Sequence, residues 1–332
     1  NFIKINACIF LNCIVHGKTL KGLAKVDLNS IISKLGASAD WERERFTMDE
    51  GCSRAVEEVF VNMYNKGLIY KGYKIVPYCP RCGTALSSHE VAQGYKDVEE
   101  TSVFVKFKLK GVDNTYFLAW TTTPWTLPSN VALCMNAKED YTKLQVEFYI
   151  LADALIPSLF KDEAEYVKID TKKGSEYEYV EYEPLFDYET GAKEKGFYAP
   201  NDSYVTLTDG TGIVHIAPAF GEDDSKVGKK YNLPFVQMVD DRGRFKDAVY
   251  DFKGLFCKDA DKYIIEKLKG ENKLFKTLKF THSYPFCWRC DTPLLYYARS
   301  SWFVKMTAVK EQLLASNDSV NWMPDTIKKG RM

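Results

Sequence analysis

Four of the nine cysteines in this 332-residue sequence occur as two C-x-x-C pairs, a spacing that suits metal binding. The pairs are Cys79 with Cys82 and Cys287 with Cys290. Each pair can direct two thiolates at one ion, and four thiolates in tetrahedral geometry are typical of a structural zinc site. Gly83 follows the first pair and favours a tight turn. We expect structural Zn2+ held by all four cysteines; a dithiol redox pair or unrelated buried cysteines are the alternatives.

The two pairs lie much farther apart in the chain than the halves of a free-standing zinc finger. If one ion joins both, the metal brings the two pairs together and everything between them is an insertion. The sequence therefore predicts a stalk closed by zinc, with a separate domain beyond it.

A second set of reactive groups is a run of hydroxyls. Thr121, Thr122 and Thr123 are consecutive, and Pro124 and Pro128 keep the segment out of a regular strand ladder. A loop of this kind presents hydroxyl donors and acceptors to a ligand. The alternative is a threonine-rich turn that caps its own backbone.

A third segment, residues 210–224, combines glycines, one histidine and clustered carboxylates. His215 stands at the end of an apolar run, and Asp224 closes an acidic triplet. A lone histidine is more often structural than catalytic. The sequence has no G-x-S-x-G motif and no Cys-His pair near this segment, so any hydrolysis here is expected to proceed without a covalent intermediate.

The elements that position these segments follow from periodicity. Thr47 and Glu50 fit a capping box, apolar residues recur at helical spacing over 56–64, and Gly67 supplies a stop signal. A strand is predicted over 68–76, leading into the first cysteine pair.

The sequence over 96–280 is typical of a mostly β domain with a few helices, because short β-branched and aromatic runs alternate with Gly, Asp and Asn. The chain then returns to a mixed pattern and a helix ending near residue 314. The predicted strands are 102–109, 115–119, 148–151 and 204–207, and the predicted helices are 223–231 and 259–268.

Bulk composition indicates an ordinary globular protein. Basic and acidic residues both number 45, so no field of one sign would draw the whole molecule onto nucleic acid or a membrane. The apolar stretch near the start is too short to span a bilayer, which favours a cytoplasmic protein without a membrane contact. We interpret both ends of the sequence as internal to a longer protein.

The threonine and histidine segments, framed by the two cysteine pairs, resemble the editing domain of the isoleucyl type of class I aminoacyl-tRNA synthetases. The resemblance covers about residues 67–332 and rests on four motifs in the same order. Valyl and leucyl relatives typically carry Arg-Pro-Glu-Thr or Arg-Pro-Asp-Thr where this chain has Thr-Pro-Trp-Thr at 123–126. The valyl type also tends to have Lys at the position of His215.

The resemblance implies a role for each matching residue. Asp224 would bind the α-ammonium of the aminoacyl group, and His215 would sit beside its side chain and help to exclude isoleucine. Asp223 is the neighbouring carboxylate and is not the functional one in the family pattern. The threonines at 121–123 would position the ester, the terminal adenosine and a water, and Trp125 and Asn130 match further pocket positions.

The implied fold is α/β. A mostly β editing domain, barrel-like with helices, is inserted through a zinc-ribbon stalk into parts of a doubly wound catalytic domain. The expected boundaries are 1–36 unassigned, 37–78 catalytic domain, 79–95 first zinc knuckle, 96–280 editing domain, 281–295 second knuckle, and 296–332 a return to the catalytic domain.

The implied activity is hydrolysis of mischarged valyl-tRNA(Ile). A single hydrophobic pocket discriminates poorly between two amino acids that differ by one methylene, and the isoleucyl enzymes are the standard example of this limit. A second pocket is therefore needed.

The parent enzyme would charge tRNA(Ile) as a monomer, and would use ATP and Mg2+ only at full length because the H-x-G-H and M-S-K signatures are absent here. The partner is the acceptor end of tRNA(Ile). The alternatives are a valyl-type enzyme that clears threonine and a zinc-ribbon RNA-binding module without catalysis.

Overall fold

A computed structural model describes residues 46–145, 147–189, 191–192, 195–324 and 326–330. The chain divides into two compact units, unit 1 (Asn1–Gly72 with Trp302–Met332) and unit 2 (Tyr73–Ser301). The expectation for residues 1–36, and the start of the segment 37–78, lie outside the described residues.

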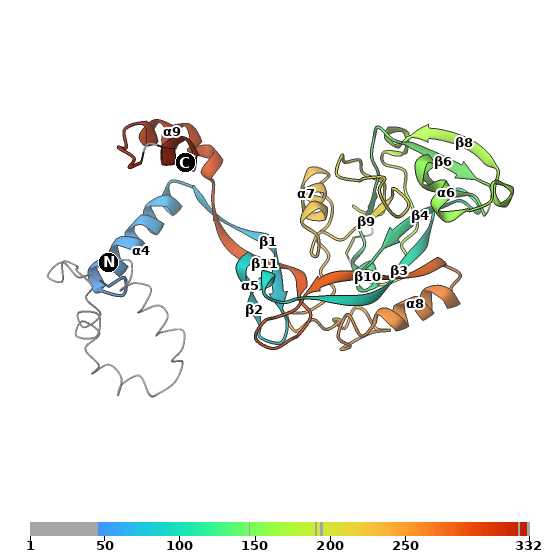
Figure 1. Cartoon of the computed structure of the whole chain (residues 1–332), viewed down its shortest axis with the longest axis horizontal. Coiled ribbons are helices and arrows are strands. Elements are labelled where there is room, and N and C mark those ends of the chain that lie inside the picture. The colour runs from blue at the N-terminus through green and yellow to red at the C-terminus, as the bar shows by residue number, and fades with distance from the viewer. Residues whose placement is uncertain (1–45, 146, 190, 193–194, 325, 331–332) are drawn as a thin grey trace. The chain divides into compact units, whose positions relative to one another are not determined.

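Unit 1 is built on helix α4 (Glu50–Asn65), which was predicted from its periodicity (Figure 1). The predicted capping box is wrong: Asp49 precedes the helix, and its carboxylate accepts from the Phe46 amide at 3.0 Å, so it is not available to the helix. The predicted stop at Gly67 is confirmed. Its φ of +67° reverses the chain, and the amide of Leu68 then bonds the Met63 carbonyl at 3.0 Å.

The rest of unit 1 follows strand β11 (Leu295–Val304). It contains η6 (Met306–Ala308), α9 (Lys310–Asp318) and α10 (Thr326–Gly330). The helix predicted to end near residue 314 therefore runs one turn farther. No helix in the described part of the chain has both the length and the apolar character needed to cross a bilayer.

A three-stranded sheet carries the cysteine pairs. Its spatial order is β11 (Leu295–Val304), β1 (Ile69–Cys79) and β2 (Thr84–Ala85). β1 confirms the strand predicted over 68–76 and extends it to the first cysteine.

The main sheet of unit 2 has six strands, and β10 and β8 are its two edge strands. The described strands therefore form an open sheet, whereas a barrel-like one was predicted. The mixed, sheet-rich character of the fold is confirmed. In spatial order the strands are β10 (Leu274–Pro285), β3 (Tyr95–Lys108), β4 (Tyr116–Thr121), β7 (Tyr149–Ala152), β6 (Asp140–Leu144) and β8 (Lys168–Lys173).

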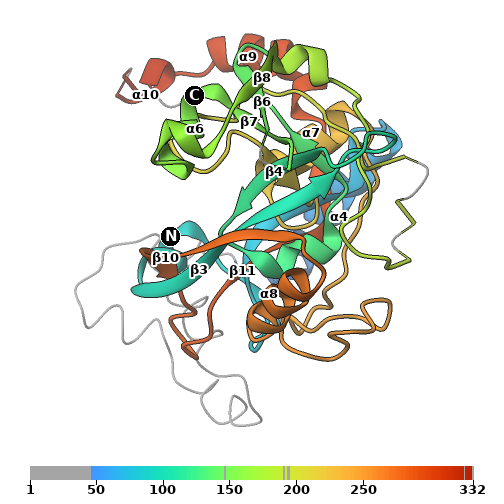
Figure 2. The ribbon, with the colours of Figure 1, turned by 90° about the vertical axis from the view of Figure 1, so that its right-hand side faces the viewer.

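The second half of β3, over 102–107, is buried on both faces, whereas its first half is charged and largely exposed. β4 is mostly buried, and its sequence is almost continuously apolar. Val103 and Phe107 point into the main core, whereas Phe104 and Leu118 belong to a second cluster on the opposite face. The long β3–β10 pair runs antiparallel over its whole length, as Figures 1 and 2 show. It therefore holds the two ends of the segment 96–280 together.

Helices and a small second sheet complete unit 2. The helices predicted at 223–231 and 259–268 are confirmed, whereas the strand predicted at 204–207 is wrong. There the Asp202 carboxylate accepts from the Tyr204 amide at 3.3 Å, a local turn that replaces a strand ladder. The remaining elements are α5 (Ser88–Ala92), η2 (Pro124–Ser129), β5 (Ala132–Cys134), η3 (Asp153–Leu155), α6 (Ile156–Leu159), η4 (Glu163–Glu165), η5 (Gly174–Tyr177), β9 (Val214–Ile216), α7 (Glu222–Lys230) and α8 (Asp261–Gly270).

Candidate functional site

The threonine loop begins where β4 ends and continues into η2. Thr121 is the last residue of β4, and its hydroxyl accepts from the Thr123 amide at 3.2 Å. The Thr126 hydroxyl donates to the Thr123 carbonyl at 2.8 Å. Part of the hydroxyl set thus stabilises the loop itself, as the alternative interpretation supposed, and the loop is held in one shape.

His215 reaches this loop from β9, which pairs with β5 beside it. Its Nε2 lies 2.9 Å from the Thr126 hydroxyl, and its buried Nδ1 has no hydrogen-bond partner among the described residues. Burial lowers the pKa of His215 to about 4, so the imidazole is neutral at pH 7. Hydroxyl contacts of 3.3 Å continue the chain from Thr126 to Thr123 and from Thr123 to Thr121.

Asp224 is presented by the first turn of α7. Its carboxylate accepts from the Ala217 amide at 2.9 Å, and burial raises its pKa to about 7. Gly221 makes this placement possible, because a Cβ there would lie 2.6 Å from the Asp224 carboxyl carbon. An acid held this way is poised to ionise when a cation enters beside it.

The structure brings these three segments to one cavity of about 280 Å³ in unit 2. All five predicted catalytic side chains line it, namely Thr121, Thr122, Thr123, His215 and Asp224. The other lining residues are Trp120, Thr126, Val214, Ala217, Phe220 and Gly221. The cavity therefore combines one carboxyl group, several hydroxyls, a neutral imidazole and apolar walls.

Two predicted substrate-binding residues are not among the lining residues. Asn130 is buried and uses its amide internally, because it donates to the Ala132 carbonyl at 2.9 Å and accepts from the Tyr182 hydroxyl at 2.6 Å. The Trp125 ring packs edge-on against Phe220 with centroids 5.0 Å apart. Both side chains support the loop from the core, and their roles in substrate binding stay predictions.

Asp223 points away from the cavity and pairs with Lys226 at 2.9 Å on the exposed side of α7. Thr126, by contrast, is a lining residue that was not singled out from the sequence. Its spacing from Thr123 could have predicted this placement, because residues i and i+3 of a 3₁₀ turn stack on the same face.

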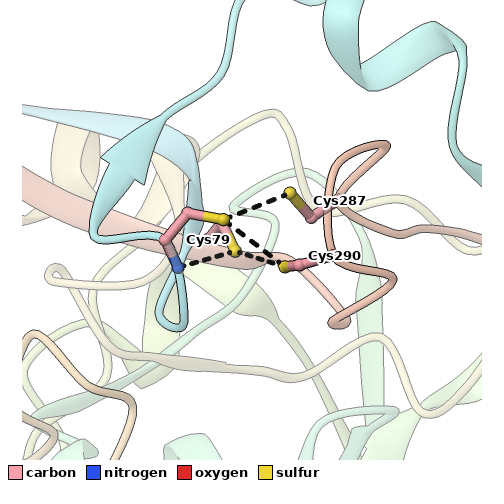
Figure 3. A group of neighbouring side chains, drawn as sticks. Cys79, Cys287 and Cys290 are labelled. Carbon is pink, nitrogen blue, oxygen red and sulfur yellow. Dashed lines mark hydrogen bonds between the residues drawn. The ribbon is translucent and has the colours of Figure 1, made fainter. Parts of the chain in front are cut away.

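The four cysteines converge from two matching turns, and Figure 3 shows the sulfurs of Cys79, Cys287 and Cys290 facing one another. In each turn the fifth residue has a left-handed backbone, Gly83 with φ +69° and Asp291 with φ +59°. Its amide bonds the carbonyl of the first cysteine at 2.8 Å in both turns. The second turn uses a non-glycine residue where the first uses glycine.

The sulfur spacing fits a tetrahedral zinc ion. Cys79 and Cys82 each place their sulfur 3.5 Å from that of Cys290, and the sulfurs of Cys82 and Cys287 are 4.0 Å apart. A Zn–S bond of about 2.3 Å implies sulfur separations of about 3.8 Å at tetrahedral angles. The four thiols could therefore hold one ion, which would act as a structural clamp.

Helix α5 connects the two knuckles. Ser87 and Glu90 form a capping box at its start, and Glu90 also accepts from Arg289 at 2.7 Å. The Glu90 carboxylate thus stabilises both the helix that follows the first knuckle and the loop of the second knuckle.

Comparison with known proteins gives the class of this chain. The family model for class I tRNA synthetases (I, L, M and V) matches residues 18–332, so the chain belongs to this family.

Curated relatives then specify the type. The isoleucine–tRNA ligase of Clostridium acetobutylicum is 54% identical over 300 residues, which cover 90% of this chain and 29% of the relative. Those of Picrophilus torridus and Treponema denticola are 46% and 45% identical, covering 91% and 90% of this chain and 29% and 30% of the relatives. The predicted resemblance to isoleucyl-tRNA synthetases is confirmed, and the chain spans 29% to 30% of the length of these relatives.

Among solved structures, the chain matches the crystal structure of GlLeuRS-CP1 with a TM-score of 0.41 and 16% identity, over 53% of this chain and 98% of that one. The editing domain of P. knowlesi cytosolic leucyl-tRNA synthetase has a TM-score of 0.41 and 13% identity over 55% of this chain and 98% of that one.

Proposed function

We propose that unit 2 hydrolyses the valyl ester of mischarged tRNA(Ile). The observation that carries the proposal is the cavity that joins a buried carboxyl group, a threonine loop and a neutral histidine. At about 280 Å³ it lies at the small end of ligand pockets, which are about 300–1,000 Å³. A small pocket with one anionic group suits a small amino acid that keeps its ammonium charge.

Asp224 is the partner for that ammonium. When the cation enters, the ion pair favours the charged carboxylate and opposes the effect of burial on its pKa. His215 is held by Thr126 and forms part of the wall beside the side chain. A wall fixed in this way excludes the extra methylene of isoleucine by sterics.

The hydroxyls of Thr121, Thr122 and Thr123 would hold the ester, the ribose of the terminal adenosine and the attacking water. Water adds its oxygen to the ester carbonyl carbon, the bond to the ribose oxygen breaks, and that oxygen leaves with a proton from the water. The products are free valine and uncharged tRNA. Because the ester is already activated, fixing a water in line with the carbonyl supplies much of the rate.

The larger protein would charge tRNA(Ile) with isoleucine by consuming ATP with Mg2+ in a region beyond the described elements. Zn2+ at Cys79, Cys82, Cys287 and Cys290 would fix the base from which the hydrolytic unit extends. The residues of 37–78 and 296–332 would then belong to the catalytic domain.

The direct test uses the zinc-loaded chain with three charged tRNAs. We expect valyl-tRNA(Ile) to be deacylated well above the spontaneous rate and isoleucyl-tRNA(Ile) to be spared, as measured by release of labelled amino acid. Preferential release of threonine from threonyl-tRNA(Val) would establish the valyl-type alternative. Binding of tRNA with every ester left intact would establish the non-catalytic RNA-binding module.

A second prediction concerns Gly221→Ala. The added Cβ would overlap the Asp224 carboxyl group and push it from its place, so kcat/KM for the valyl ester is expected to fall about tenfold to a hundredfold. Gly51→Ala is the matched control, because a Cβ there meets nothing within 4 Å. Circular dichroism would establish that both variants fold, and an unchanged kcat/KM in Gly221→Ala would remove the need for this carboxyl position.

A further inference from the structure

The hydroxyl of Thr126 makes three polar contacts at the wall of the proposed hydrolytic cavity. It donates to the Thr123 carbonyl at 2.8 Å, and it lies 3.3 Å from the Thr123 hydroxyl and 2.9 Å from Nε2 of His215. Thr126 is 5% exposed, so water competes little for these contacts. The Thr126 hydroxyl therefore ties the threonine loop to β9, the strand that carries His215.

The direction of each contact follows from counting hydrogens. A hydroxyl group has one hydrogen and can accept two hydrogen bonds. The shortest contact of Thr126 goes to a carbonyl oxygen, which can only accept, so the Thr126 hydrogen lies on that contact. The Thr126 oxygen then accepts from Nε2 of His215 and from the Thr123 hydroxyl. This assigns His215 to the tautomer that carries its hydrogen on Nε2.

The other ring nitrogen of His215 supports the same tautomer. Nδ1 is buried and meets no partner in the described part of the chain. A hydrogen on Nδ1 would be a buried donor without an acceptor, and such donors are rarer in folded proteins than buried acceptors with an unused lone pair. Because burial lowers the pKa of His215 to about 4, the ring carries a single hydrogen at pH 7, and that hydrogen lies on Nε2.

The same direction continues through the threonine hydroxyls. Since Thr126 accepts, the Thr123 hydroxyl is the donor of their contact, and the Thr121 hydroxyl is then the donor to Thr123 at 3.3 Å. Thr121 also accepts from the Thr123 amide at 3.2 Å. These contacts leave one lone pair on each of the Thr121 and Thr123 oxygens, and both residues line the cavity. A water that donates to these oxygens keeps its own lone pairs for the ester carbonyl.

We propose that Thr126 is a positioning residue of the hydrolytic site, whose hydroxyl holds His215 as the Nε2–H tautomer and orients the hydroxyls of Thr121 and Thr123 as acceptors for the attacking water. This inference rests on the proposed hydrolysis and adds a residue to which the family resemblance assigned no role. Both lone pairs of the Thr126 oxygen are occupied, so Thr126 acts through these three neighbours.

The kinetic test compares Thr126→Val, which keeps the shape of the side chain and removes the hydroxyl, with Thr126→Ser, which keeps the hydroxyl. For Thr126→Val we expect kcat for valyl-tRNA(Ile) to fall at least about tenfold with KM within about twofold, because the water is misplaced while Asp224 still binds the ammonium. Thr126→Ser should stay within about threefold of the unmodified kcat. Thr208→Val is the control, because it removes an exposed threonine–threonine contact of 3.1 Å with Thr206.

The tautomer of His215 gives a readout that does not depend on activity. Nitrogen-15 spectra of the histidine-labelled chain distinguish a protonated ring nitrogen from a bare one, and His215→Gln identifies the His215 signals among the four histidines. At pH 7 we expect the hydrogen on Nε2 in the unmodified chain and in Thr126→Ser. In Thr126→Val neither ring nitrogen has a partner, so a mixture of the two tautomers is expected.

An Nδ1–H tautomer in the unmodified chain, an unchanged tautomer in Thr126→Val, or equal losses of kcat in Thr126→Val and Thr126→Ser would overturn the inference. Circular dichroism would establish that the variants fold, and the spectrum of the unmodified chain tests the tautomer even if Thr126→Val does not. If the unmodified chain hydrolyses none of the esters, the proposed function fails, and the ring spectra alone then decide whether Thr126 sets the tautomer of His215.

Discussion

Asp224→Ala is expected to lose at least about a hundredfold in kcat/KM for valyl-tRNA(Ile), mainly through KM. The reason is that the ammonium of the bound ester would be left in the cavity without its counter-ion, and removing one partner of a buried ion pair costs about 3–5 kcal/mol. Steady-state deacylation at several ester concentrations measures both constants. Asp223→Asn is the matched control, because Asp223 is the next residue, is exposed and pairs with Lys226.

The pH dependence of the same variants gives a second measure. Asp224 has a pKa of about 7, so ammonium binding should strengthen as pH rises through 7. It should weaken again once the α-amino group of the ester loses its proton, at about 7.7–8.0 in peptides. A plot of 1/KM against pH is therefore expected to be bell-shaped. Asp224→Asn should remove the rise on the acidic side of this plot.

The stability of the folded chain should fall as pH rises, whereas ammonium binding by Asp224 should strengthen. The folded-state pKa of Asp224 lies above its ordinary value of 3.8, so its contribution to stability is complete below 3.8 and is lost as pH rises through 7. Asp224→Asn is therefore expected to unfold at a higher urea concentration than the unmodified chain at pH 8, with a smaller difference at pH 5. A variant that is less stable at pH 8 and keeps its KM would contradict the placement of this carboxyl group.

The site shows which inferences a sequence can carry. Cysteine spacing and turn chemistry are local, so the two knuckles followed directly from C-x-x-C pairs and the glycine after Cys82. The contact between Thr126 in η2 and His215 in β9 links residues that are 89 positions apart, and no periodic pattern encodes such a contact. The grouping of the threonine and histidine segments came from family resemblance alone.

The errors have local physical causes. Thr47 and Glu50 fitted a capping box by residue type, but Asp49 is the residue that precedes the helix, and its carboxylate accepts from the Phe46 amide instead. The aromatic and β-branched run near Tyr204 fitted a strand, but the Asp202 side chain offered its amide a turn. Asn130 is polar and close to the loop in sequence, and only the core contacts at Ala132 and Tyr182 reveal that it supports the backbone.

Loss of the metal is the other change expected to have a large effect. The cluster around the knuckles is small, with Leu86, Val91 and Leu294 as its only apolar members besides the cysteines among the described residues. So few side chains supply little hydrophobic stabilisation. Binding of structural zinc to such sites is worth about 10–16 kcal/mol in small domains at pH 7, so the ion would supply most of the local stability.

Cys287→Ser is therefore expected to reduce bound zinc from one ion per chain to nearly none and to lower the free energy of unfolding by several kcal/mol. Metal analysis and urea unfolding measure the two effects, and prolonged treatment with a strong chelator should reproduce them. Cys52→Ser is the control, because Cys52 lies in α4 and outside the cluster. The main core of unit 2 is built from β3, β4 and their neighbours, so part of the deacylation should survive. A chain that never holds zinc, or a Cys52→Ser variant that loses as much stability as Cys287→Ser, would show that the knuckles are joined by the fold without a metal.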